Sequence, residues 1–309
     1  MKSREEFKQF GQEHLMPELR RFEKRRRHLL LKIILLLIIT AILLVPSLFV
    51  LSIPLIHLPS VIALIFLIFT CDELFRKYPA DFKNTITPRI LTFIDPSLTY
   101  SAKDYISKKD FKVCNLFESH VEQYRGSDLV QGRVGNTNIK FSYIKADRSR
   151  NDNDSEIFQG LFIVIDMNKE FCGQILVYPN IAEQYLGPFG KTLNSIVLKK
   201  GERINLENPK FNDEFAVYSN DQIKARYILT PSLMERILEL KENFRFIPSL
   251  SFTRSKVYIV NRQFSKTINP NIFKNISDFD SCYDYFVELQ KIIGIVNELD
   301  LNTRIWTKE

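Results

Sequence analysis

The sequence contains few residues of the kinds that usually form a recognisable catalytic or metal centre. It has four histidines and four cysteines in 309 residues, and the cysteines form no CxxC pair. No HExxH, GxSxG or GxGxxG motif is present, so the sequence indicates no catalytic residue, no metal site and no cofactor. Cys114 and His120 could in principle form a nucleophile–base pair, but nothing near them in the sequence would orient it. Widely spaced single thiols are typical of a reducing compartment.

Two segments approach a ligand-binding motif without completing it. Gly190-Lys191-Thr192 ends like a phosphate-binding loop, but Tyr185 stands where that motif needs a glycine. The run Asp152–Glu156 opens like a calcium loop, but Ile157 occupies the position of the required glycine. Both segments are therefore interpreted as polar loops.

Charged side chains are absent from Ile33 to Cys71, a stretch of 39 residues. As one helix this stretch would be about 58 Å long, against about 30 Å of bilayer hydrocarbon. We therefore predict a transmembrane hairpin over residues 29–71, with spans at Leu29–Val50 and Pro54–Cys71 joined at Ser52–Pro54. A re-entrant hairpin, bent at its prolines inside the bilayer, is the alternative that stays open.

Basic residues flank this stretch on both sides. Residues 1–32 hold ten Lys and Arg against five Asp and Glu, whereas residues 33–309 hold 33 against 31. Because positive charge stays on the cytoplasmic side of a membrane, the pattern predicts cytoplasmic N- and C-termini. The nearly neutral remainder of the chain gives no support for nucleic-acid binding.

Residues 1–28 are predicted to form a basic amphipathic arm. Apolar side chains recur at helical spacing at Phe7, Phe10, Leu15, Leu19 and Phe22. One interpretation is an interfacial helix on anionic lipid, with Arg25, Arg26 and Arg27 near the headgroups. The other, which we favour, is a topology signal and a helix that packs on the soluble domain, because orientation already requires the basic residues.

Residues 72–309 are predicted to form one cytoplasmic α+β domain. Helices broken at Pro79, Pro88 and Pro96 are expected over residues 72–127. Strands are expected at Leu129–Val134, Ile139–Ala146, Ile157–Ile165, Phe171–Tyr178, Ser195–Leu198, Arg203–Leu206, Phe215–Tyr218, Leu250–Thr253 and Val257–Val260. Short turns between successive strands, including one that returns Ile157–Ile165 directly into Phe171–Tyr178, indicate a mainly antiparallel sheet.

Three flanking helices follow from capping and periodicity. Ser219 and Gln222 have the spacing of a capping box, and Thr230-Pro231 is typical of a helix start. The helix after Pro231 should turn Leu233, Met234, Ile237 and Leu238 inward. A C-terminal helix should bury the face marked by Phe279, Cys282, Phe286, Leu289, Ile293 and Val296.

Two stretches resemble a known family. They are FNDEFAVYSNDQIKARYILTPSLMERILEL, from Phe211 to Leu240, and EIFQGLFIVIDMNKEF, from Glu156 to Phe171. Together with the two apolar spans, they resemble a bacterial membrane-protein family known as domain of unknown function 3137, over most of the chain from the anchor to about Val260. The resemblance implies a cytoplasmic domain behind a hairpin in the bacterial inner membrane, and it implies no reaction.

Within the first stretch, Tyr218, Asp221, Arg226 and Tyr227 are candidates for contact with a partner or an anionic ligand. The competing interpretation is that Asp221 caps a helix, Arg226 pairs with a carboxylate and the tyrosines pack with their hydroxyls outward. The function favoured by the whole sequence is a membrane-anchored interaction or scaffold module with a protein or lipid partner. The alternatives are an enzyme that acts on a membrane-associated substrate and a carrier with a Phe-lined cavity for an apolar ligand.

Overall fold

The computed structural model describes residues 2–49, 58–117, 120–148, 156–167, 171, 173–180, 201–244, 247–262 and 279–299. Several sequence predictions lie outside these residues, namely the hairpin connection at Ser52–Pro54, the Asp152–Ser155 loop, the Gly190–Thr192 loop and the strand Ser195–Leu198. The chain packs as two compact units. The first comprises Met1–Ile94 and Ile268–Val287, and the second comprises Asp95–Thr267 and Glu288–Glu309. Residues 72–94, which we had placed in the soluble domain, thus pack with the N-terminal helices.

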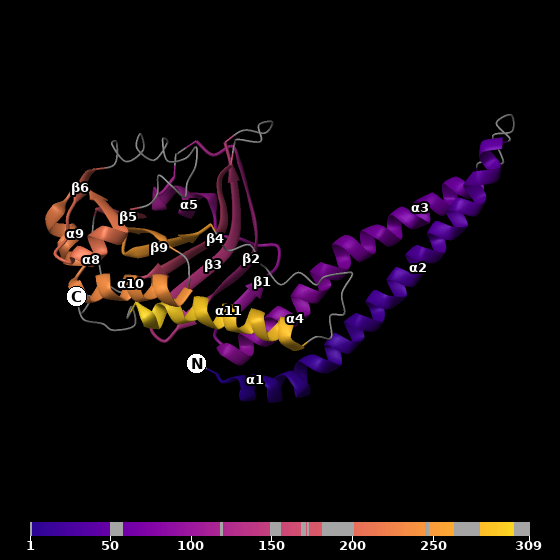
Figure 1. The fold of residues 1–309 in the computed structure, drawn as a ribbon, viewed down its shortest axis with the longest axis horizontal. Helices are drawn as coiled ribbons and strands as arrows, with labels where there is room; N and C mark the ends of the chain where they lie inside the picture. Colours follow the sequence, from indigo (N-terminus) through magenta and orange to yellow (C-terminus); the bar gives the residue numbers. More distant parts are fainter. Residues whose placement is uncertain are drawn as a thin grey trace. The chain divides into compact units, whose positions relative to one another are not determined.

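The first unit is helical (Figure 1). Its elements are α1 (Arg4–Phe10), the π-helical segment η1 (Gly11–Leu15), α2 (Met16–Phe49), α3 (Leu58–Asp72), the π-helical segment η3 (Glu73–Lys77), α4 (Tyr78–Ile94) and the start of α11 (Phe279–Glu298). Ser3 begins α1 with a capping box, because its hydroxyl accepts from the Glu6 amide and the Glu6 carboxylate accepts from the Ser3 amide.

The expected helix breaks at Pro79 and Pro88 are wrong, because the helix runs through both prolines to Ile94. A proline removes one amide donor and crowds the carbonyl four residues before it. Each π-helical segment ends two residues before a proline, Pro17 or Pro79, and closes with an i→i−5 bond, as from the Tyr78 amide to the Glu73 oxygen. This wider turn gives the crowded carbonyl room, so the helix continues.

The apolar face of the N-terminal arm is buried inside the first unit. Phe7, Leu15 and Leu19 are at most 1% exposed, and Phe22 packs edge-on against Tyr78 and Phe82. A face covered in this way is not available for insertion into lipid. The observed arm is therefore a packed helix, and its partners are α4 and the first half of α11.

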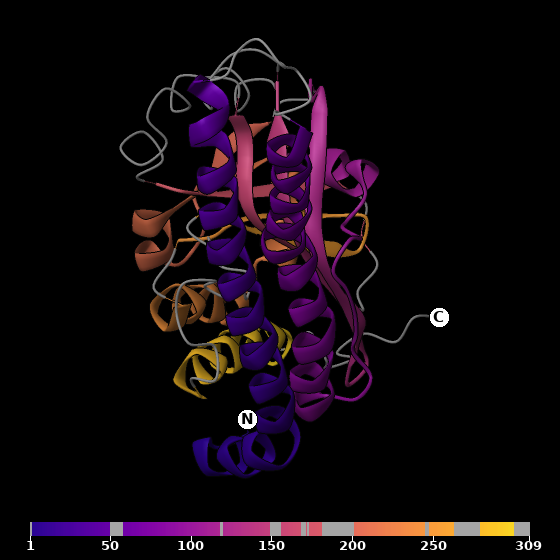
Figure 2. The same ribbon diagram turned by 90° about the vertical axis from the view of Figure 1, so that its right-hand side faces the viewer.

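Helices α2 and α3 lie side by side (Figures 1 and 2) and pack against each other. Elsewhere they expose apolar side chains. Small side chains are buried along them, at Thr40, Ser60, Ala63 and Thr70, which lets the two backbones approach closely. Large apolar side chains are exposed at Leu31, Ile34, Leu35, Leu37, Ile38, Ile42 and Leu44 of α2, and at Leu58, Val61, Ile62, Leu64, Ile65, Phe66, Ile68 and Phe69 of α3. In water such a surface would be strongly unfavourable.

The second unit contains a nine-stranded antiparallel sheet in the order β1-β2-β3-β4-β9-β8-β5-β7-β6. The strands are β1 (Thr99–Ser101), β2 (Gln123–Val134), β3 (Thr137–Asp147), β4 (Glu156–Asp166), β5 (Gln174–Pro179), β6 (Glu202–Ile204), β7 (Phe215–Ser219), β8 (Ser249–Thr253) and β9 (Lys256–Asn261). The α+β class and the antiparallel sheet are confirmed. Helical structure throughout 72–127 is wrong, because β1 and the start of β2 fall within that range.

The predicted direct return from the fourth strand into the fifth is also wrong. The late hairpin β8–β9 inserts between them, so β4 pairs with β9 and β5 pairs with β8. Strand β4 is apolar on both faces, which is typical of a strand in the middle of a sheet, where another strand pairs along each edge. A short turn would have satisfied its periodicity equally well, so the choice of β9 depends on long-range packing.

Among its described residues, the second unit also contains the helices α5 (Lys108–Cys114), α8 (Pro209–Glu214), α9 (Gln222–Ile228) and α10 (Pro231–Phe244). The inward faces predicted for α10 and for the C-terminal helix from Cys282 onward are confirmed, because each named side chain from Leu233 to Leu238, and from Cys282 to Val296, is at most 8% exposed. Phe279, the first residue named for the C-terminal face, is only partly buried. Thr230 begins α10 by accepting from the Leu233 amide, as predicted.

Helix α5 is held by an aromatic core. Phe111 is 2% exposed and packs among Phe117, Phe158 and Phe162. Next to this cluster, the Tyr178 hydroxyl donates to the Leu116 carbonyl. Burial raises the pKa of Tyr178. Burial likewise raises the pKa of Tyr258, to about 12. The core fixes α5 over the sheet.

Candidate functional site

The four residues proposed at the β7–α9 corner are largely occupied within the protein. Asp221 is the N-cap of α9, where its carboxylate accepts from the Lys224 amide at 3.0 Å. That hydrogen bond, assisted by the Lys224 ammonium, holds the pKa of Asp221 below its usual value. Arg226 donates to the Asn205 carbonyl at 3.1 Å and pairs with the Glu207 carboxylate at 3.8 Å. These contacts match the structural interpretation of the pair.

The tyrosines of this corner do not converge on a shared site. Tyr218 lies on β7 edge-on to Tyr178, with the ring centroids 6.2 Å apart, whereas Tyr227 on α9 is 46% exposed. The capping box predicted from Ser219 is a different turn, since the Ser219 hydroxyl donates to the Gln174 carbonyl and accepts from the Asp221 amide. A role for the corner in partner binding stays a prediction.

The three arginines proposed for lipid contact are engaged by carboxylates. Arg25 donates to Asp81 at 2.7 Å and to Glu73 at 3.2 Å, so it ties α2 to η3 and α4. Arg26 and Arg27 both bind Glu23, and the Arg26 and Glu23 side chains are less than 10% exposed. Arg27 is 66% exposed and is the member of this group best placed to reach a headgroup.

Cys114 and His120 are not arranged for nucleophilic catalysis. The Cys114 thiol is fully buried and donates to the Phe111 carbonyl, whereas His120 is exposed beside Glu122 at 3.4 Å. Among the described residues, no group of three His, Cys, Asp or Glu side chains could hold a metal ion.

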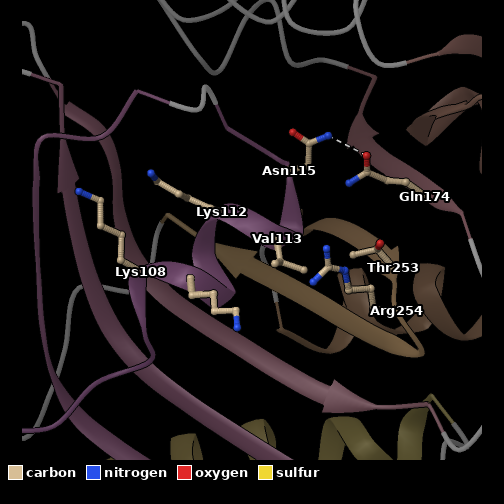
Figure 3. A pocket seen from close by; sticks show the side chains of 8 residues that line it. Lys108, Lys112, Val113, Asn115, Gln174, Thr253 and Arg254 are labelled. Atoms are coloured by element: carbon tan, nitrogen blue, oxygen red, sulfur yellow. Dashed lines mark hydrogen bonds between the residues drawn. The ribbon is translucent and has the colours of Figure 1, made fainter.

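An open pocket of about 730 Å³ lies beside α5 (Figure 3). Three structural elements line it, namely α5 with the residue after it, the start of β5 and the β8–β9 turn. The lining residues are Lys108, Lys109, Lys112, Val113, Asn115, Gln174, Thr253 and Arg254. Four of these eight carry a positive charge and none carries a negative one.

The cations of this pocket are largely uncompensated. Lys109, Lys112 and Arg254 have no carboxylate partner within the described part of the chain, and Lys108 donates only to the Glu122 carbonyl, at 3.4 Å. The acid of α5, Asp110, is turned away to Lys140 at 2.7 Å. Partial burial raises the pKa of Asp110, but the hydrogen bond from Lys140 and that from Ser107 outweigh it, and the pKa lies below its usual value. The pocket therefore has a positive potential.

Neutral amides complete the lining. The Asn115 amide donates to the Gln174 side-chain oxygen at 2.7 Å, and the Gln174 amide donates to the Cys114 carbonyl at 3.3 Å. Sequence reasoning missed this site because its parts are far apart in the chain. The lysine run of α5 and the non-glycine turn Arg254-Ser255 were the signals available for it.

Part of the chain matches a known protein family. Residues 156–301 match the family described as "Protein of unknown function (DUF3137)". This part of the chain belongs to the DUF3137 family. The DUF3137 segment runs from β4 through α11, so it begins well after the two apolar helices and extends beyond the expected limit at Val260. It contributes Gln174, Thr253 and Arg254 to the pocket, whereas the lysines of α5 precede it. No curated protein and no solved structure matches the chain.

Proposed function

We propose that the chain is an integral protein of the bacterial cytoplasmic membrane, anchored by α2 and α3 as a two-span hairpin with both termini in the cytoplasm. Its α+β unit would serve as an interaction or scaffold module at the inner face. The observation that carries this proposal is the exposed apolar surface of α2 and α3.

Burial distinguishes these helices from the core helices of a soluble protein. Two helices in the described part of the chain, Arg4–Leu44 and Leu58–Ile94, are long and apolar enough to cross a membrane. Only 11% and 22% of their most apolar windows are buried inside the protein, whereas a core helix of this composition would be mostly buried. Lipid is the environment that suits such a surface on all sides.

The uncharged parts of the two helices are somewhat shorter than the hydrocarbon core of a bilayer. The uncharged part of α2, from Ile33 to Phe49, rises about 25 Å, and that of α3, from Leu58 to Cys71, rises about 21 Å. Bilayer hydrocarbon is about 30 Å thick, so the spans need uncharged residues from the connection or snorkelling of Lys32. A re-entrant hairpin needs less length and is the alternative to test.

The scaffold role is favoured over the carrier role by the nature of the cavities. The pocket beside α5 is lined mainly by polar and charged side chains, and the Phe rings next to α5 are packed against one another. A carrier of an apolar ligand would need an open cavity lined by those rings.

Alkaline carbonate extraction of membranes tests the anchor. We expect the full chain to stay in the membrane pellet, because two apolar spans are held by the hydrophobic effect and not by charge. Release into the supernatant would overturn the proposal.

Cysteine accessibility tests the topology. We expect Ser52→Cys, in the predicted connection, to react with an impermeant maleimide added outside spheroplasts. Lys103→Cys, from the exposed loop before α5, is the matched control and should react only after permeabilisation. Protection of Ser52→Cys in intact spheroplasts would support the re-entrant hairpin, and outside labelling of Lys103→Cys would refute the cytoplasmic orientation.

A further inference from the structure

We propose that the pocket beside α5 binds a phosphate-bearing anion. This inference concerns the second unit alone and does not depend on the membrane anchor. Three local features support it. Each is unfavourable for the stability of the folded protein, and all three belong to the lining of this one pocket.

The first feature is the position of the lysines on α5. Lys108 and Lys109 lie in the first turn of the helix, directly after the N-cap Ser107, where the helix dipole disfavours positive charge. Lys112 lies four residues after Lys108 and three after Lys109, so it repels both. Helix stability therefore does not explain this arrangement, and a bound anion would offset all of these repulsions.

The second feature is the backbone of the β8–β9 turn. Arg254 and Ser255 have φ angles of 50° and 58°, a left-handed conformation that two-residue hairpin turns usually assign to Asn-Gly. The turn is held in place because the Ser255 carbonyl accepts from the Met167 amide at 2.9 Å. The strained turn thus presents an arginine, the longest fork-shaped donor available, at the rim of the pocket.

The third feature is the absence of a counter-charge. The guanidinium of Arg254 and the ammonium groups of Lys109 and Lys112 face no carboxylate in the described part of the chain. In Figure 3, Arg254 reaches from the turn toward Val113, whereas the side chains of Lys108 and Lys112 extend from α5 away from Arg254. The ligand would lie between the turn and the helix, and the flexible lysine stems would close on it.

The chemistry of the lining identifies the class of ligand. A guanidinium provides paired donors, lysines provide point charges and the Asn115–Gln174 pair provides a neutral polar wall, which is a set that suits phosphate oxygens. A volume of about 730 Å³ is larger than an inorganic ion needs and fits a phosphorylated small molecule or a lipid headgroup. The two sources share the phosphate, and an experiment can separate them.

The test uses the full chain in nanodiscs and measures acylation of individual lysines by mass spectrometry. Inorganic pyrophosphate added to phosphatidylcholine discs should protect Lys109 and Lys112, whereas Lys103, outside the pocket, should be unaffected. Protection by phosphatidylglycerol in the disc, without pyrophosphate, would assign the site to a headgroup. Absence of protection in both arms, or equal protection of Lys103, would overturn the proposal.

Two variants make the test specific to the pocket. Arg254→Gln should weaken pyrophosphate protection about tenfold, which corresponds to one lost charge-assisted hydrogen bond. Lys109→Glu should abolish the protection of Lys112 and yet raise the thermal midpoint, because an acidic residue in the first turn is favourable. Lys103→Glu is the matched charge reversal and should change neither quantity. Pyrophosphate protection that survives Lys109→Glu would contradict the proposed site.

Discussion

The first helix depends on a single aromatic ring. Phe7 on α1 is 0% exposed. Five rings surround it at centroid distances of 4.2 to 6.2 Å, those of Phe10, Phe93, Phe279, Tyr283 and Phe286. The closest, Phe286, is stacked at 4.2 Å. Because α1 is the N-terminal end of the continuous helix Arg4–Leu44, where helices open most easily, replacement of this ring should release it from α4 and α11.

The size of the effect follows from burial and ring contacts. Truncation of a fully buried Phe to Ala costs about 3–5 kcal/mol, and each aromatic pair adds about 0.5–1.5 kcal/mol beyond area. We expect about 4 kcal/mol for Phe7→Ala. Since about 1.4 kcal/mol is one decade in an equilibrium constant, local opening of α1 should become about 1,000-fold more frequent.

Hydrogen exchange measured by mass spectrometry on the full chain in detergent checks this value. Amides of Arg4–Phe10 and of Tyr283–Val287 should exchange faster in Phe7→Ala, whereas those of α9 should not change. Ile223→Ala, which removes a side chain that is 83% exposed, is the control and should have an effect within about 0.5 kcal/mol. Acceleration of the α1 amides by less than about tenfold would refute the assignment of Phe7 as the anchor of this helix.

Three further outcomes follow from the second unit. Gly160→Ala should destabilise it by more than about 3 kcal/mol in denaturant unfolding, since at φ 152° a methyl group would overlap the Asn261 carbonyl oxygen. The pKa of Asp110 is lowered in the folded protein, so its pairing with Lys140 stabilises the fold above about pH 4, the pKa of an aspartate in the unfolded chain. This stabilisation is lost as the pH falls through the pKa of Asp110 in the folded protein. Asp110→Asn should therefore weaken the dependence of the unfolding free energy on pH in that acid range and nowhere else. Asp221→Ala should cost about 1 kcal/mol through the lost α9 cap, seen as a lower thermal midpoint, and an unchanged midpoint would argue against the cap.

Local patterns predicted much of the secondary structure correctly. The inward face of α11 and the Thr230 cap depend on residues within one or two helical turns, so periodicity and capping chemistry were sufficient. The same holds for the β2–β3 hairpin, whose turn contains Gly135 at φ 59°. The predicted break at Pro79 was wrong, because the π-helical segment that accommodates this proline has no sequence signature of its own.

The candidate sites were the least predictable part. Arg25 was one of three candidates for contact with lipid, but its carboxylate partners Glu73 and Asp81 lie 48 and 56 residues further along the chain. The pocket brings together Lys109 and Arg254, whose separation is greater still. Neither pairing can be derived from spacing, because each depends on how distant elements pack.

The sequence by itself determined the two apolar helices, the α+β class and the antiparallel pairing, because hydrophobic periodicity, uncharged length and turn chemistry act over neighbouring residues. Only the tertiary structure decided that β9 inserts beside β4, that carboxylates engage Arg25 and Arg26, and that α5 faces the β8–β9 turn across a basic pocket. Those outcomes depend on which buried surfaces fit together, and that selection is made by packing between residues far apart in the chain.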